Sequence, residues 1–167
     1  MSIIEDRDPS VHLDILAARY ADMPVTPLYP FGHGLSYTKF EYSNLRIDPA
    51  QMDPAGTARV SVDVKNAGGR AGVETAQLYV HETYTPVSTP VKQLRGFERV
   101  SLAAGESKTV TFMLTPDDLS LLDEHLHRIV APGDFEIMVG RSSEDLPLQG
   151  MLKVQNRRGG SAGSNGR

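Results

Sequence analysis

Two histidines of this chain, His125 and His127, are separated by a single residue and follow the acidic pair Asp123–Glu124. Residues two apart share one face of a strand, so two imidazoles placed there could ligate a metal ion. The same stretch, "LDEHLH", also fits a charged hairpin tip that leads into a strand, because no further ligand is fixed nearby. We predict the hairpin tip and no metal site, with metal ligation as the alternative.

Carboxylates are the second group that could do chemistry, because a suitably separated pair can hydrolyse a glycosidic bond. Asp117 and Asp118 are adjacent, follow a proline and precede an apolar run. That context favours capping of a short helical turn within residues 115–122 by one of the two aspartates. Glu74 and Glu82 lie on one predicted strand with polar neighbours, and we expect both to be solvated.

Sequence motifs for other catalytic chemistry are absent from the chain. The sequence has no G-x-S-x-G, no glycine-rich loop followed by a phosphate-binding lysine, and no G-x-G-x-x-G after a strand. We therefore predict no cofactor. A free-standing enzyme with an unfamiliar site is the least favoured interpretation.

Composition excludes several further classes of function. The 167 residues carry a net charge of -4, which disfavours nucleic-acid binding, and contain no cysteine for a disulfide or thiolate site. No apolar run approaches the roughly 20 residues of a membrane helix, so we expect no membrane partner. The N-terminus "MSIIEDRDPS" is acidic and lacks the apolar core of a secretory signal, which leaves the localisation unknown.

Period-two alternation dominates the chain from about residue 40, which is typical of half-buried strands. The alternating runs are separated by the turn signals "DPAG", "NAGG", "AAGE" and "APGD". A phase slip in the first run predicts a bulge near Ser43 and Asn44. Short alternating strands with regular turns predict an all-β, antiparallel β-sandwich, with strands expected within residues 40–47, 59–66, 73–82, 108–115, 128–130, 134–140 and 148–154.

The two ends of the chain differ from this pattern. A short helix could begin at Asp8–Pro9 and end before Pro24. The glycine- and serine-rich tail at 156–167 cannot bury apolar surface, and we expect it to be disordered.

One segment before the first strand, "PLYPFGHGLSYTKF" at 27–40, is both stiff and apolar. Its two prolines fix φ, and Gly32 and Gly34 permit a sharp bend or a positive φ. We call residues 27–38 the strap. We predict that its apolar side chains bury against a partner surface, as an interdomain interface formed by Tyr29, Pro30, Phe31, Leu35 and Tyr37.

A second irregular segment, residues 83–91, connects two predicted strands. It is longer than a hairpin requires and is rich in threonine and proline, so it is either a plain connection or a functional loop. A dedicated sugar-binding module usually presents aromatic platforms, and this chain has no tryptophan. The candidate functional residues of this loop are Tyr84, Thr85, Pro86 and Val87.

The motifs together resemble one known family. P-L-Y-P-F-G-x-G-L-S-Y-T, followed at the right separation by P-V-K-Q-L-R-G-F, is similar to the C-terminal part of glycoside hydrolase family 3 enzymes of the bacterial periplasmic β-glucosidase type. The resemblance covers roughly residues 17 to 155. It implies a fibronectin type III-like (immunoglobulin-like) sandwich at 39–155, preceded at 1–38 by the end of a catalytic domain and the strap.

The resemblance also implies what the chain lacks. The two catalytic carboxylates of the family lie on preceding domains that do not fit into this chain, so no catalytic residue carries over. It implies a non-catalytic accessory domain, on a truncated or split chain, of an enzyme that hydrolyses terminal β-linked glucosides or xylosides. The expected partners are the catalytic domains, and the 83–91 loop is then expected at the active-site rim. An independent β-sandwich module that binds polysaccharide or a protein is the alternative.

Overall fold

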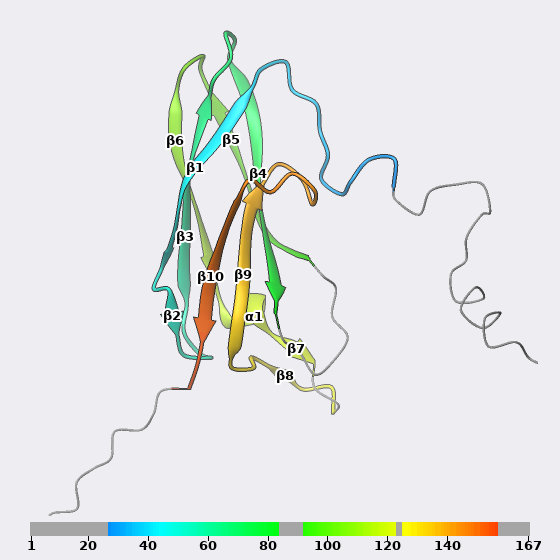
Figure 1. The fold of residues 1–167 in the computed structure, drawn as a ribbon, viewed down its shortest axis with the longest axis vertical. Coiled ribbons are helices and arrows are strands. Elements are labelled where there is room, and N and C mark those ends of the chain that lie inside the picture. The colour runs from blue at the N-terminus through cyan, green and yellow to red at the C-terminus, as the bar shows by residue number, and fades with distance from the viewer. Residues whose placement is uncertain (1–26, 84–91, 123–124, 157–167) are drawn as a thin grey trace, which may run out of the picture.

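The computed structural model describes residues 27–83, 92–122 and 125–156. Within these ranges the chain is almost entirely β-structure (Figure 1), with one short helix. The elements are β1 (Phe40–Asp48), β2 (Gln51–Met52), β3 (Ala58–Asn66), β4 (Gly72–Glu82), β5 (Gln93–Leu102), β6 (Ser107–Leu114), α1 (Pro116–Leu119), β7 (Leu121–Leu122), β8 (Arg128–Ile129), β9 (Gly133–Gly140) and β10 (Leu148–Val154). The predicted helix after Asp8, the 84–87 candidates and the disorder of residues 157–167 lie outside the described residues.

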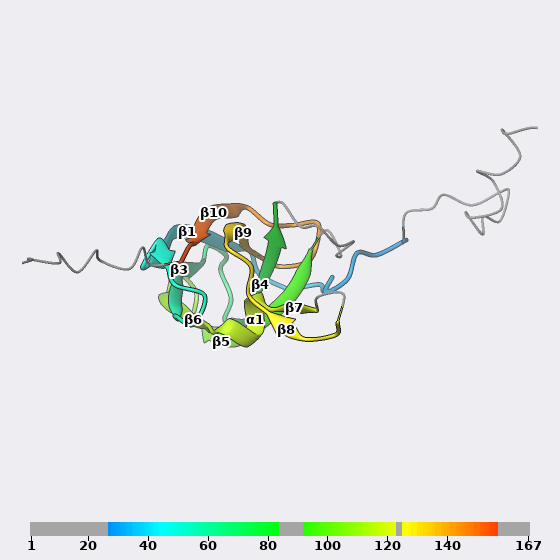
Figure 2. The ribbon, with the colours of Figure 1, turned by 90° about the horizontal axis from the view of Figure 1, so that it is seen from below.

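Two sheets form the predicted sandwich. One has the strand order β1-β3-β6 and the other β2-β10-β9-β4-β5, while β7 and β8 form a separate small pair. The pairings are antiparallel apart from the short parallel pairing of β2 with β10. Figure 2 shows the sandwich end-on, with the two sheets enclosing a common interior. The prediction of an antiparallel β-sandwich is confirmed.

The core lies between the sheets and follows the alternation of the sequence. In β3, Val60, Val62 and Val64 are fully buried, while Arg59 and Lys65 on the other face are exposed. Branched side chains of this kind pack well on a pleated surface, and their burial is the main favourable contribution to folding. Each buried valine of this kind contributes about 1.5–3 kcal/mol through the loss of apolar surface from water.

Local details of two elements were also predicted. The register of β1 against β3 shifts between Ser43 and Arg46, and Asn44 has a φ of 55°, so the predicted bulge is present. The predicted helical turn is α1, but its N-cap is Thr115 rather than an aspartate. Asp118 instead accepts hydrogen bonds from the Thr115 backbone N–H at 2.8 Å and from its hydroxyl at 2.7 Å, which forms a capping box.

One strand edge near the strap remains open. β4 pairs with β5 from Gly72 to Val80, but it pairs with β9 only from Gln77 to Glu82. The edge of residues 72–76 that faces away from β5 therefore has no strand beside it within the described part of the chain. An unpaired strand edge presents N–H and C=O groups that can bind another group.

Candidate functional site

The strap precedes β1 and passes the loop between β9 and β10 (Figure 1, blue). Its large apolar side chains are exposed: 94% of Leu35 and 97% of Tyr37 are accessible to solvent. The other exposed members are Leu28, Tyr29 and Phe31. Pro30 is half-buried. Monomeric proteins rarely leave such a contiguous apolar segment uncovered, so this segment is the leading candidate for an interface.

Hydrogen bonds fix the outer part of the strap to the sandwich, although its side chains are exposed. The Gly32 carbonyl accepts a hydrogen bond from the Gln77 side-chain amide at 3.0 Å. The Phe31 carbonyl accepts one from the Ser143 backbone N–H at 2.9 Å, in the loop between β9 and β10. A turn closes between them, with the His33 N–H donating to the Pro30 carbonyl at 3.0 Å.

We call the hydrogen bonds from Gln77 and Ser143 to the strap the anchor, and Gln77 is its central residue. It lies on the face of β4 opposite the core and is nevertheless buried, with 6% of its surface exposed. Its amide group also donates to the Arg141 carbonyl, and its oxygen accepts from the Tyr79 hydroxyl at 2.7 Å. Buried polar atoms need such partners, and here both the oxygen and the nitrogen of the Gln77 amide are satisfied.

The anchor also explains one of the two strap glycines. Gly32 has a φ of +78°, and a Cβ atom placed on it would lie 2.1 Å from the Gln77 amide oxygen. A side chain at this position would therefore be strained in its backbone and would clash with the anchor. The predicted positive φ is present at Gly32, whereas Gly34 has no positive φ and open space around it.

The inner end of the strap is held where β1 begins. The Thr38 hydroxyl donates to the Asn66 side-chain oxygen at 2.7 Å, and the Lys39 carbonyl accepts from the Ala67 N–H at 2.8 Å. Asn66 is completely buried and donates in turn to the carbonyls of Arg70 and Leu102. The strap is therefore tied to the sandwich near both ends, and its exposed side chains have a defined backbone beneath them.

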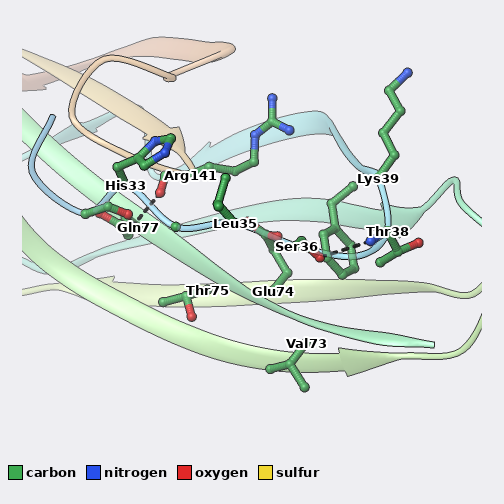
Figure 3. A pocket seen from close by; sticks show the side chains of 13 residues that line it. His33, Leu35, Ser36, Thr38, Lys39, Val73, Glu74, Thr75, Gln77 and Arg141 are labelled. Carbon is green, nitrogen blue, oxygen red and sulfur yellow. Dashed lines mark hydrogen bonds between the residues drawn. The ribbon is translucent and has the colours of Figure 1, made fainter. Parts of the chain in front are cut away.

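A pocket of about 530 Å³ lies between the strap and the open edge of β4 (Figure 3). Glu74 lines it, and only 7% of this residue is exposed. Its carboxylate accepts a hydrogen bond from the Tyr42 hydroxyl at 2.8 Å. Burial raises the pKa of the Glu74 carboxyl, against the lowering effects of the Tyr42 hydrogen bond and of Arg141. Burial and the neighbouring Glu74 likewise raise the pKa of the Tyr42 hydroxyl.

The expectation that Glu74 and Glu82 are solvated is therefore wrong. Both residues share the alternation of Ala76 and Leu78, whose side chains point into the sandwich. Glu74 is buried, and Glu82 is half-buried with a pKa raised by burial. The polar neighbours Thr75 and Gln77 suggested an exposed face, but they belong to the other side of the strand.

Two further apolar side chains extend the exposed surface beyond the strap. Phe97 of β5 is 65% exposed and lies opposite Gln77 in the pairing of β4 with β5. Val73 is 47% exposed and lines the same pocket as Leu35. The apolar surface therefore continues from the strap onto the outer side of the β4–β5 pair.

The other candidate residues lie apart from this region. His125 and His127 are exposed, and their ring centroids are 6.2 Å apart. Among the described residues, no group of three His, Cys, Asp or Glu side chains is placed to hold a metal ion. Asp118 is engaged in capping α1. Nor does any helix in the described ranges have the length and apolar character needed to cross a membrane.

The structure thus describes all five predicted strap residues and places them in one segment. The loop candidates Tyr84, Thr85, Pro86 and Val87 lie outside the described residues. Sequence reasoning missed the anchor and the hydrogen bond from Tyr42 to the buried Glu74 beside it. One signal was available, because Gln77 and Tyr79 are large, uncharged residues on the supposed solvent face of β4, where a solvated strand usually carries charged or small polar residues.

Comparison with known proteins identifies the sandwich. Residues 74–143 match the family model of the fibronectin type III-like domain. A β-xylosidase of Formosa agariphila is 45% identical over 126 residues, which are 75% of this chain and 17% of that enzyme. Thermostable β-glucosidase B of Acetivibrio thermocellus is 44% identical over 140 residues, which are 83% of this chain and 18% of that enzyme.

Solved structures agree with this result. The β-glucosidase of Listeria innocua, in its complex with glucose, superposes with a TM-score of 0.75 at 37% identity. The match covers 90% of this chain and 21% of the Listeria enzyme. This chain therefore spans about a fifth of the length of the relatives that it matches. The remaining four-fifths of each relative have no counterpart in it.

Proposed function

Because this chain carries the fibronectin type III-like domain of glycoside hydrolase family 3 β-glucosidases and β-xylosidases, we propose that it serves as a non-catalytic accessory domain of such an enzyme. In this role it binds the catalytic domains through the strap and stabilises them. The enzyme as a whole would hydrolyse terminal β-linked glucosides or xylosides, as the names of the relatives suggest.

The exposed but anchored strap is the observation that carries this proposal. Leu35 and Tyr37 are almost fully accessible, yet Gly32, Phe31 and Thr38 hold the backbone in place. A preordered apolar segment loses little conformational entropy when it binds, which favours a permanent interface. The relatives supply an obvious occupant, because each has several hundred further residues beside the matching region.

The pocket beside the strap offers no pair of carboxyl groups for glycoside hydrolysis. That reaction requires two carboxyl groups facing each other across a bound sugar. Glu74, the buried carboxyl of the pocket, is hydrogen-bonded to Tyr42 and has no second carboxyl among the residues that line its pocket. Asp118 accepts hydrogen bonds from Thr115 in the capping box of α1. The proposal therefore assigns the chemistry to the catalytic domains and the stability of the assembly to this one.

A chimaeric enzyme tests the proposal. The region of the Listeria innocua β-glucosidase that matches this chain is replaced by this chain, and in a second form it is deleted. We expect the chimaera to be soluble and to hydrolyse an aryl β-glucoside, whereas the deleted form loses solubility or unfolds at a lower temperature. The isolated chain should show no hydrolysis.

Strap variants provide the specific readout. Leu35→Ser with Tyr37→Ser should lower the thermal midpoint of the chimaera and leave that of the isolated chain unchanged. Met113→Ser is the matched control. Met113 is 53% exposed on β6, which belongs to the three-stranded sheet and not to the sheet of β4 that supports the strap. A deleted form as stable and active as the chimaera would refute the accessory role, as would hydrolysis by the isolated chain.

A further inference from the structure

We propose that the strap is a latent strand that closes onto the open edge of β4 and extends the sheet there. In the structure, residues 33–36 form no strand, and the pocket of about 530 Å³ occupies the gap between them and β4 (Figure 3). Both the strap and the edge belong to this chain, so closure needs no group from another protein. Closure is completed when the parent enzyme assembles, and this timing alone rests on the proposed function.

The strap already runs antiparallel to the open edge of β4. Near one end of the edge, the Gly32 carbonyl accepts a hydrogen bond from the Gln77 side chain at 3.0 Å. Near the other end, Thr38 lies against Gly72, because a Cβ atom placed on Gly72 would be 2.6 Å from the Thr38 Cγ2 atom. The strap therefore advances from residue 32 to residue 38 while β4 runs back from residue 77 to residue 72. This is the direction of an antiparallel neighbour.

The contact between Thr38 and Gly72 also fixes which residues lie opposite one another after closure. In an antiparallel pair, each step forward on one strand is matched by one step back on the other. The opposite pairs are therefore Tyr37 with Val73, Ser36 with Glu74, Leu35 with Thr75 and Gly34 with Ala76. At the far end, Gly32 lies beside Gln77, one residue out of this register, and the turn that closes between Pro30 and His33 can absorb the extra residue.

The faces of the two segments match in this register. In the strap, Thr38 faces the sandwich, where its hydroxyl donates to the buried Asn66, while Tyr37 is 97% exposed. In β4, Glu74 is buried and Val73 is 47% exposed. Because side chains alternate along a strand, the register places the exposed Tyr37 beside the exposed Val73. A shift by one residue would place Tyr37 opposite the buried Glu74 instead, so the alternation supports the register independently of the contact.

Few residues have to be ordered for the strap to close, because both of its ends are already held. The Gly32 carbonyl is hydrogen-bonded to Gln77, and the Lys39 carbonyl accepts from the Ala67 N–H, so only residues 33–37 change position. A short segment tethered at both ends loses little further conformational entropy when it docks beside its tethers. Closure gives the N–H and C=O groups of both segments each other as hydrogen-bond partners in place of water.

Closure also completes the surface that the parent enzyme would cover. Leu35, Tyr37 and Val73 then lie on one side of two neighbouring strands. An apolar surface on a paired strand is better ordered than one on an unpaired segment, so it loses less conformational entropy when a partner binds. A partner that covers this surface removes water from the gap and thereby strengthens the hydrogen bonds between the two backbones. Closure and assembly therefore reinforce each other.

A pair of introduced cysteines tests the register, because the chain has no cysteine of its own. Leu35→Cys with Thr75→Cys joins two residues that are opposite in the closed state, where Cα atoms are about 4.5–5.5 Å apart and within the reach of a disulfide. The matched control is Ser36→Cys with Thr75→Cys, which is one residue out of register and places its thiols on opposite faces. Oxidised glutathione is added to the isolated chain, and the intramolecular disulfide is followed by mass spectrometry.

We expect the in-register pair to form its disulfide at least about tenfold faster than the control pair. Tyr37→Cys with Val73→Cys is a second in-register pair and should behave like the first. After oxidation, the amides of residues 73–76 that point away from β5 should exchange their hydrogens more slowly than in the reduced chain. Equal rates for in-register and control pairs, or unchanged exchange after oxidation, would overturn the proposal.

The chimaeric enzyme shows whether the closed strap is the assembled form. With Leu35→Cys and Thr75→Cys, the oxidised chimaera should keep its activity and unfold at no lower temperature than the reduced one, and the chimaera without these cysteines is the reference. If oxidation lowers the thermal midpoint of the chimaera but not that of the isolated chain, assembly requires an open strap. Closure is then wrong while the accessory role stands. If the chimaera gains nothing from this chain, the proposed function fails, whereas a fast in-register disulfide in the isolated chain would still support closure.

Discussion

The strap and strand β3 are both rich in apolar residues, but these residues are exposed to solvent in the strap and buried in β3. Val60, Val62 and Val64 of β3 are completely buried between the sheets. Leu35 and Tyr37 of the strap are almost completely exposed, although the Gly32 and Lys39 carbonyls on either side of them accept hydrogen bonds from the sandwich. The comparison shows that order and burial are separable in this molecule. Burial stabilises the sandwich, whereas a few polar contacts order the strap.

A pair of identical substitutions should show this difference most strongly. Leu78 of β4 is fully buried and Leu35 of the strap is 94% exposed. Leu78→Ala should lower the free energy of unfolding by about 2–5 kcal/mol, because it removes buried apolar contacts and leaves a cavity. Leu35→Ala should change it by no more than about 0.5 kcal/mol. Urea denaturation of the isolated chain measures both, and a large loss for Leu35→Ala would show that the strap is part of the core.

A pair of glycine substitutions tests the anchor. Gly32→Ala introduces a side chain at a φ of +78° and a clash with Gln77, whereas Gly34→Ala meets nothing within 4 Å. We expect Gly32→Ala to cost about 1–3 kcal/mol and to release the outer strap. The Ser143 amide, which donates to the Phe31 carbonyl, should then exchange its hydrogen faster. Equal protection of this amide in both variants would contradict the anchor.

The pH dependence of stability provides the smallest of the expected effects. Burial raises the pKa of the Glu74 carboxyl above its ordinary value of 4.5, so the folded state binds this proton more tightly than the unfolded state. The stability that protonation of Glu74 contributes is complete below the ordinary pKa and is lost as the pH rises through the raised pKa. Ionised Glu74 therefore opposes folding at neutral pH.

The variant Glu74→Gln isolates this contribution. Its amide oxygen can still accept from Tyr42, so we expect a change within about 1 kcal/mol at neutral pH. Relative to the wild type, the variant should be most favoured near neutral pH and should lose this advantage as the solution is acidified. Denaturation at several pH values provides the difference profile, in which the contributions of other groups cancel. A wild type that gains stability from ionisation of Glu74 would reverse the slope and contradict the burial argument.

Most of the sandwich could be predicted from the sequence because its strands alternate cleanly. The valines of β3 and the phase slip at Ser43 and Asn44 depend only on neighbours along the chain. The anchor could not be predicted in this way. It joins Gly32, Gln77 and Arg141, which are brought together only when the strap, β4 and the loop after β9 assemble. The burial of Glu74 was misjudged for a related reason. The sequence indicates which face of β4 carries Glu74, but it does not show that the first residues of β4 are covered by Tyr42 of β1.

The two-sided burial of β4 has a consequence for how this domain can change its sequence. From Ala76 to Val80, five successive residues are buried, because one face packs in the core and the other supports the strap. Strand β3 has an outward row, including Arg59 and Lys65, where substitutions can accumulate without harm. In this part of β4 no such neutral row exists. Substitutions in this part of β4 should therefore be more harmful than substitutions on the outward row of β3.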